Sequence, residues 1–362
     1  MALPYQNTRI QAITEDWINP RLQDQIFGKG TRAWRTLSSR VESNPATNVY
    51  YPIRTGKIAG ATRSRTGNLS GTTTLTGPPA TQVTLAKSYE YWNLALHDDD
   101  INENQGPEQI ANYVATQTQI LADSARTDME RWIWTAQTST YPASLVDAID
   151  GVGQTGTENT YAGIGTDDLP EWEAFTMESA HTTGTDTGVS PSLENVMKML
   201  HTMEDYNGVL PDAGFCQGPL WDHLANLIAQ NTYLAGVRQG YEVDWGTNVL
   251  RIGEVPIFRD RNVPGAAYDG TKSTRALAAG YRLYFVTWDS FHLYATPGEF
   301  LQLGSWMRPA DNNVLYLNTL KFSGNLICDH RRANGVIYNI DLTIPETSHT
   351  EGSVYWNGAL CA

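Results

Sequence analysis

Cysteine is scarce in this chain of 362 residues, which contains only Cys216, Cys328 and Cys361. Their number is odd and their spacing matches no metal-binding motif, so the sequence predicts neither a disulfide framework nor a zinc site. Sparing use of cysteine is typical of proteins from reducing compartments. We therefore expect all three thiols to be free.

Long apolar runs are also missing. No run approaches the roughly 18 residues that a membrane-spanning helix requires. The segment Met1–Ile10 lacks the basic region and apolar core of a signal peptide. We therefore expect no membrane partner and no export.

Motifs of catalysis are absent or incomplete. There is no zinc-protease, Walker or nucleophile-elbow pattern. Gly151, Gly153 and Gly156 match the spacing of a dinucleotide fingerprint, but residues 157–168 show no helical period after it, which favours a loop. The consecutive residues 97–100, one His and three Asp, favour a solvated turn over a metal site. We expect no enzyme activity, no cofactor and no metal.

Charge is unevenly distributed. The chain has a net charge of −14, yet residues 1–65 contain ten Lys and Arg against four acids. A basic leading segment on an acidic body predicts contact with nucleic acid or with the acidic body of a neighbouring copy. No acidic residue lies between Glu42 and Glu90, and this stretch includes Arg54, Lys57, Arg63 and Arg65.

Residues 47–96 predict an extended β-hairpin. Residues 49–53 are strand-like, residues 82–86 alternate polar and apolar side chains, and the intervening residues 56–77 are mostly Gly, Thr, Ser, Arg and Asn. The hairpin has too few large apolar residues to bury itself, and an isolated two-stranded hairpin is marginally stable in water. We expect it to lie on another subunit.

The strongest helical period covers residues 107–138, which would form a helix about 45 Å long. We expect its apolar face to pack on closing strands at 313–344, and Arg126 and Glu130 to form a surface ion pair. The residues assigned to that face are Ile110, Val114, Ile120, Leu121 and Trp132. Helices are also predicted at 192–206 and 219–228, with strands at 249–252, 255–258, 282–286 and 291–294, which indicates an α+β fold.

The order of these parts and several local patterns resemble the major capsid proteins of tailed bacteriophages (Caudoviricetes), whose shell fold is the Hong Kong 97 type. The resemblance covers nearly the whole chain and includes no catalytic signature. The local patterns are Asp16–Pro20, Gln25–Gly28, Pro170–Trp172, Leu210–Ala213, Gly253–Asp260 and Leu326–Arg332.

The resemblance implies a division of the chain into five parts. These are an N-terminal arm at 1–45, an extended loop (E-loop) at 46–98, a peripheral domain with a long spine helix at 99–209 and 311–350, an axial domain at 210–310, and a C-terminal tail at 351–362.

The function implied is a homo-oligomeric structural protein that self-assembles into hexamers and pentamers of an icosahedral head shell. That shell would enclose double-stranded DNA in a virion assembled in the host bacterial cytoplasm. Expected partners are other copies, a separate scaffolding protein, a portal, a decoration protein, and DNA contacted non-specifically. Met1 opens directly onto the arm, so scaffolding would be separate or dispensable. The candidate subunit-contact residues are Arg54, Lys57, Arg63, Arg65, Arg331 and Arg332.

Two other functions remain open on the sequence alone. An encapsulin-like shell of a protein nanocompartment would share the fold and enclose cargo protein. A nicotinamide-dependent oxidoreductase would rest on the glycine motif alone.

Overall fold

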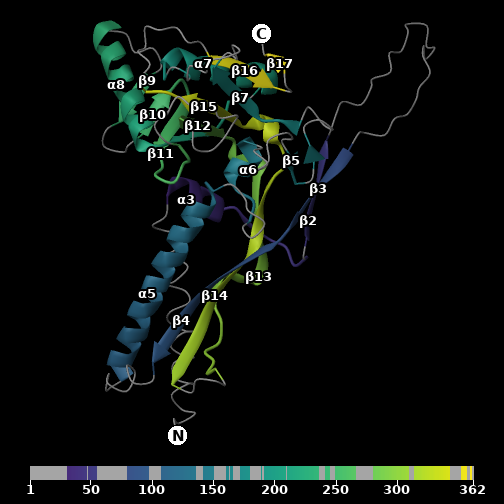
Figure 1. Cartoon of the computed structure of the whole chain (residues 1–362), viewed down its shortest axis with the longest axis vertical. Coiled ribbons are helices and arrows are strands. Elements are labelled where there is room, and N and C mark those ends of the chain that lie inside the picture. Colours follow the sequence, from purple (N-terminus) through teal and green to yellow (C-terminus); the bar gives the residue numbers. More distant parts are fainter. Residues whose placement is uncertain are drawn as a thin grey trace, which may run out of the picture.

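In the computed structural model, most of the described residues form two β-sheets with helices packed on them (Figure 1). The N-terminal 30 residues, the glycine motif at 151–156 and Asp98–Asp100 lie outside the described residues. Those described are 31–46, 48–54, 80–97, 107–135, 142–150, 160–162, 164–165, 172–179, 189, 191–208, 210–235, 241–244, 249–265, 280–309, 314–342, 352–356 and 359–360.

A four-stranded sheet carries the long helix. Its strand order is β1-β13-β14-β4. Strand β14 pairs antiparallel with both β13 and β4, whereas β1 pairs parallel with β13. The helix α5 (Pro107–Trp132) runs beside β4 and β14 (Figure 1). The strands are β1 (Val41–Ser43), β4 (Ser88–His97), β13 (Phe291–Leu303) and β14 (Leu315–Cys328).

Helix α5 begins at Pro107, as predicted, and ends at Trp132, six residues before the predicted end at residue 138. Its buried stripe includes Val114, Ala125 and Met129. The Trp132 ring lies 5.8 Å from the Phe322 ring of β14. The predicted packing on the closing strands is therefore confirmed for Trp132.

The assignment of Ile120 to the buried face was wrong, because this side chain is 56% exposed. At 3.6 residues per turn, Ile120 points about 120° away from Val114 around the helix axis. Leu121, one residue later, takes the inward position and is buried. The apolar residue at 120 therefore belongs to the outer surface of the subunit.

Glu130 was expected on the surface, and this prediction was also wrong, because Glu130 is only 4% exposed. The backbone N–H of Thr31 donates to Glu130 Oε1 at 3.0 Å. Arg126, the ion-pair partner that the sequence predicted, lies 3.8 Å from the same carboxylate, and Arg261 lies 3.6 Å from it. Burial raises the pKa of Glu130 despite these three favourable contacts.

A second buried carboxylate, Asp260, lies close to Glu130. It accepts hydrogen bonds from Trp134 Nε1 at 3.1 Å and from the backbone N–H of Asn262 at 3.0 Å. Burial raises its pKa as well. Together the two acids join the end of α5 to the helix α3 (Arg32–Ser38) and to the turn after strand β11 (Val255–Arg259).

The larger sheet has nine strands in the order β17-β16-β7-β15-β12-β8-β11-β10-β9. Helices α7 (Leu193–Asn207) and α8 (Gly218–Ala235) lie with it in the upper part of Figure 1, and a short helix α6 (Leu145–Asp150) precedes it in the chain. The strands are β7 (Phe175–Ser179), β8 (Ala213–Cys216), β9 (Tyr241–Asp244), β10 (Val249–Ile252), β11, β12 (Tyr281–Val286), β15 (Gly335–Ile340), β16 (Gly352–Trp356) and β17 (Ala359–Leu360).

Helix α7 follows its sequence signals closely. The Ser192 side chain accepts a hydrogen bond from the backbone N–H of Asn195, which caps the helix start. Gly208 ends it at φ 73°, in the left-handed region that glycine tolerates best. Met199, Leu200 and Met203 face a core that this helix shares with α8 and the nine-stranded sheet.

The two sheets do not divide the chain at residues 210 and 310, where the axial domain was expected to begin and end. Strand β13 lies inside that range, yet it pairs with β14 beyond it. Strands β7 and β15 lie outside the range, yet they complete the nine-stranded sheet. Consecutive strands joined by a short connection usually pair in one sheet, as β13 and β14 do. A domain boundary at residue 310 would therefore separate two paired strands.

Cys216 and Cys328 are buried and free, as expected. Burial raises the pKa of both thiols, that of Cys328 to about 12. Cys361 lies outside the described residues. None of the described helices is both long enough and apolar enough to span a membrane.

The buried and exposed faces of α5 predict different losses of stability when an aspartate is introduced. Val114→Asp should cost about 3–5 kcal/mol, because it leaves a carboxylate unpaired in the core. Ile120→Asp should cost less than about 1 kcal/mol, because its side chain reaches solvent. Soluble yield and denaturant unfolding of both variants check this expectation, and an equal loss in both would contradict the helix orientation.

The buried acids predict an unusual pH dependence. A carboxyl group with a raised folded-state pKa destabilises the fold at neutral pH, and this cost disappears as pH falls through that pKa. Glu130→Gln keeps an oxygen acceptor for Thr31, so it should reduce the stability gain between pH 7 and pH 5. Thermal unfolding at both pH values measures this. The exposed Glu204→Gln on α7 serves as the control, and an unchanged pH slope for Glu130→Gln would exclude the effect.

Candidate subunit-contact surfaces

The predicted hairpin is confirmed as a two-stranded ribbon. Strand β2 (Asn48–Arg54) pairs antiparallel with β3 (Ala80–Ala86), from Asn48 opposite Ala86 to Arg54 opposite Ala80. Among the described residues, these two strands form a sheet with each other only. Both outer edges of the ribbon therefore offer backbone donors and acceptors to another strand. A ribbon of this kind gains stability by lying on a larger surface.

The base of the ribbon is fixed by Lys87, the single residue between β3 and β4. This lysine is 7% exposed. Its Nζ donates to the backbone oxygen of Asn44 and, at 3.0 Å, to Oγ1 of Thr296 in β13. Burial lowers the Lys87 pKa, while the charge of Glu299 opposes that shift. Sequence reasoning did not single out Lys87, although a lone lysine between two strand-like runs was a signal.

The candidate contact residues of the basic stretch are only partly placed. Arg54 is the last residue of β2, and its backbone faces Ala80. Lys57, Arg63 and Arg65 lie outside the described residues. Their contacts with a neighbouring subunit stay predictions.

Arg331 was proposed as a subunit-contact residue, and the structure corrects this. It is 1% exposed. Its Nε and Nη1 donate to the backbone oxygens of Ala148 at 2.5 Å and Trp172 at 2.9 Å. The guanidinium also lies 5.4 Å from the Tyr161 ring centroid. A side chain enclosed in this way cannot reach a neighbouring subunit, so Arg331 is a core residue.

Arg332 is partly exposed, and its hydrogen bonds connect the turn that follows β14 to the C-terminal end of α7. Its Nη2 donates to the backbone oxygen of Tyr206 at 2.7 Å, and Asn207 Nδ2 donates to the Arg332 backbone oxygen at 2.7 Å. A cation at the end of a helix also interacts favourably with the helix dipole. Contact between Arg332 and a neighbour stays a prediction.

Large exposed apolar side chains concentrate on the smaller sheet and α5. Tyr89 and Tyr91 project from the outer face of β4 and are 49% and 55% exposed. Ile120 on α5 and Met307 after β13 are 56% and 65% exposed. Single exposed apolar residues are normal on a protein surface, so these side chains do not by themselves identify a subunit contact.

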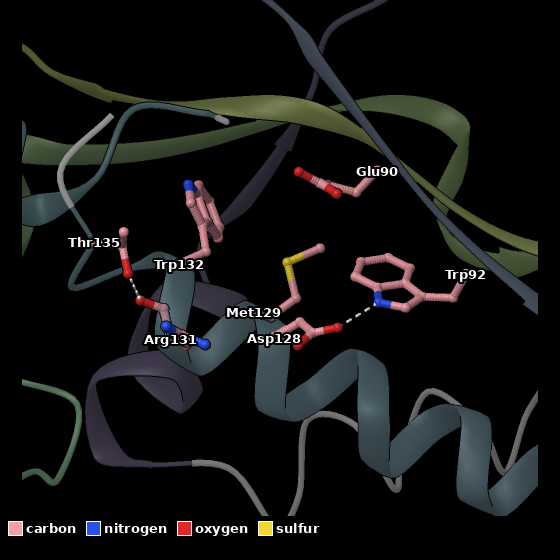
Figure 2. A pocket seen from close by; sticks show the side chains of 7 residues that line it. All are labelled: Glu90, Trp92, Asp128, Met129, Arg131, Trp132 and Thr135. Carbon is pink, nitrogen blue, oxygen red and sulfur yellow. Dashed lines mark hydrogen bonds between the residues drawn. The ribbon is translucent and has the colours of Figure 1, made fainter. Parts of the chain in front are cut away.

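A cavity of about 340 Å³ opens between α5 and β4 (Figure 2). Glu90 and Trp92 reach it from β4, while Asp128, Met129 and Trp132 reach it from α5. Trp92 Nε1 donates to Asp128 Oδ2 at 2.8 Å. Burial, and secondly the charge of Asp128, raise the pKa of Glu90. Sequence reasoning missed this cavity, because its walls come from two separate elements.

Within the described ranges, no three His, Cys, Asp or Glu residues cluster in a way that could hold a metal ion. His97 ends β4, and the three aspartates that follow it lie outside those ranges.

The different positions of Arg331 and Arg332 predict different costs of replacement. Arg331→Met should destabilise the subunit by about 2–4 kcal/mol, because it leaves two buried backbone oxygens without donors. Arg332→Met should cost less than about 1 kcal/mol. Denaturant unfolding of both variants provides the comparison, and a small loss for Arg331→Met would mean that its buried contacts contribute little.

Comparison with known proteins gives structural matches only. No protein-family model and no curated protein matches the chain. A subunit in the cyanophage A-1(L) capsid asymmetric unit matches with a TM-score of 0.61 and 15% identity, over 84% of this chain and 91% of that one. The SrpI encapsulin from Synechococcus elongatus PCC 7942 matches with a TM-score of 0.52 and 12% identity, over 89% and 92%.

A further match is a chain of the satellite phage P4 procapsid, which includes size determination protein. Its TM-score is 0.51 and its identity 9%, over 94% of this chain and 98% of that one. The three matches cover 84–94% of this chain and 91–98% of the matched chains. The chain therefore has the Hong Kong 97-type α+β fold, which phage capsids and an encapsulin share.

Proposed function

We propose that this chain is the major capsid protein of a tailed bacteriophage, which assembles into hexamers and pentamers of an icosahedral head around double-stranded DNA. The observation that carries the proposal is the β2–β3 ribbon, whose strands pair only with each other among the described residues. On a fold shared with a phage capsid, a ribbon with open edges is best explained by a neighbouring copy that covers it. Head-to-tail contacts of this kind close into rings.

The parts of the fold suggest an adjusted domain map. We assign the axial domain to the nine-stranded sheet with α7 and α8, and the peripheral domain to α5 with the four-stranded sheet. The E-loop corresponds to the ribbon and the residues that connect its strands. A separate scaffold, a portal and a decoration protein remain proposed partners, and the virion remains the proposed location.

An encapsulin-like shell is the second candidate, favoured by the match to the SrpI encapsulin. It differs from a phage head in what the shell contains. A nicotinamide-dependent oxidoreductase draws no support from a fold shared with shell proteins.

The contents of purified particles separate the two shell functions. Full-length chain should sediment as capsomers or larger particles, visible by negative-stain microscopy. Nuclease-protected DNA in particles from infected or induced cells would support the capsid, and a co-purifying cargo protein would support the encapsulin. A monomer that never assembles, with or without a scaffold, would contradict both.

The basic stretch predicts a charge effect on assembly. Reversing Arg63 and Arg65 to Glu should block or slow assembly while the subunit stays folded. Each exposed ion pair contributes only about 0.2–1 kcal/mol, but the contact repeats in every copy. Light scattering at several salt concentrations measures the effect. Arg251→Glu with Arg259→Glu makes the same charge change at exposed positions of β10 and β11, outside the basic segment, and equal assembly of both double variants would contradict the prediction.

A further inference from the structure

The cavity between α5 and β4 has the composition of a receptor for a cationic side chain. In Figure 2 the carboxylates of Glu90 and Asp128 enter from opposite walls, and the Trp92 and Trp132 rings lie on its two sides. Carboxylates supply charge and hydrogen-bond acceptors, while aromatic faces attract cations through their quadrupole. The combination suits a guanidinium or ammonium group better than an apolar or anionic one.

The charges around the cavity are not balanced within the subunit. Among the described residues, the Glu90 carboxylate has no hydrogen bond or ion pair, and the charge that acts on it is the like charge of Asp128. Asp128 has one oxygen hydrogen-bonded to Trp92. Arg131 also lines the cavity, but it is exposed and forms no ion pair with either acid in the described structure. An excess of negative charge therefore remains at a partly dry site, where an added cation would be favourable.

We propose that this cavity, here named the Glu90–Asp128 pocket, binds a Lys or Arg side chain from residues 54–65 of a second copy of the chain. The proposal rests on the proposed function, since it names the surface on which the basic stretch of a neighbour docks. The carboxylates would pair with the incoming cation, and Trp92 and Trp132 would enclose its apolar stem and charged head.

Charge complementarity identifies the occupant. Residues 43–89 contain no acid, and of their five cations Lys87 is already bound inside the subunit. The remaining four are Arg54, Lys57, Arg63 and Arg65. In the sequence they end β2 or follow it, and the β2–β3 ribbon has two edges that can pair with a partner surface.

The direction of the ribbon favours a second copy over the same chain. Ala80, at the far end of the ribbon, lies ten residues before Glu90 along two nearly continuous strands. At about 3.3 Å per residue, this corresponds to roughly 33 Å of extended chain. Figure 1 shows β2 and β3 leading away from α5, and Arg54 is the residue at the far end of β2, opposite Ala80.

The test is a double-mutant cycle on assembly of the full-length chain. Glu90→Gln with Asp128→Asn removes the pocket charge and keeps its shape, and the Asn oxygen can still accept from Trp92. We expect the concentration needed for assembly to rise about tenfold, the effect of one ion pair held against aromatic rings. Glu204→Gln with Asp205→Asn, two exposed acids on α7, is the charge-matched control and should leave that concentration unchanged.

The pocket variant is then combined with Arg54→Gln, Lys57→Gln, Arg63→Gln or Arg65→Gln. If the pocket binds one of these cations, at least one combination will be no worse than its single parents. Additive losses in all four combinations would overturn the proposal. Equal thermal unfolding temperatures for the single subunits of each variant exclude a folding defect as the cause of lost assembly.

Cross-linking distinguishes a second copy from the same chain. One chain carries Asp128→Cys and a second chain carries Cys in place of the coupled cation, for example Arg63→Cys. Both also carry Cys361→Ser, and the two chains are co-assembled under oxidation. Disulfide-linked dimers support the proposal, and their absence from normal particles overturns it. If the wild-type protein never assembles, the proposed function and this inference both fail. If the wild-type protein and the pocket variant assemble at the same concentration, this inference alone fails.

Discussion

The antiparallel pairing of β4 with β14 is the contact on which the rest of the subunit depends. All ten residues of β4 pair with β14, from His97 opposite Leu315 to Ser88 opposite Gly324. This pairing places the ribbon, which is continuous with β4, at one end of the sheet. It also provides the surface for α5, through contacts such as Trp132 with Phe322. Without it, neither the ribbon nor the long helix would have a fixed position relative to the larger sheet.

Buried polar residues hold the remaining segments to this frame. Arg331 connects α6 and the chain before β7 to the turn that follows β14. Glu130 and Asp260 connect α5 to α3 and to the turn after β11. Each of these residues satisfies backbone groups or ring N–H groups that come from distant parts of the sequence. Such contacts specify one arrangement of the segments, because a buried polar group left without its partner is costly.

Local sequence signals were sufficient where a structure depends on neighbouring residues. The capping residues Ser192 and Gly208 delimit α7, and alternating side chains indicate the strands of the ribbon. Signals failed where the answer depended on a distant partner. The helical period of α5 shows which residues share a face, but the position of β4 decides that Leu121 points inward and Ile120 outward. In the sequence Arg331 stands between His330 and Arg332 and looks like part of a basic surface cluster. Its burial could not be predicted, because the carbonyl groups that it binds lie 183 and 159 residues away. The Glu90–Asp128 pocket was invisible for the same reason.

The pairing of β4 with β14 also sets the order in which a nascent chain can fold. About 220 residues separate His97 from Leu315. A ribosome adds roughly 5–20 residues per second, so β14 is synthesised on the order of ten to forty seconds after β4. During that interval Leu94 and Leu96, both buried in the finished subunit, have no strand to cover them. Contacts of such long sequence separation also form slowly once synthesis is complete. The emerging subunit therefore keeps apolar strand residues uncovered for most of its synthesis, and rapid expression at high concentration is expected to favour aggregation over folding.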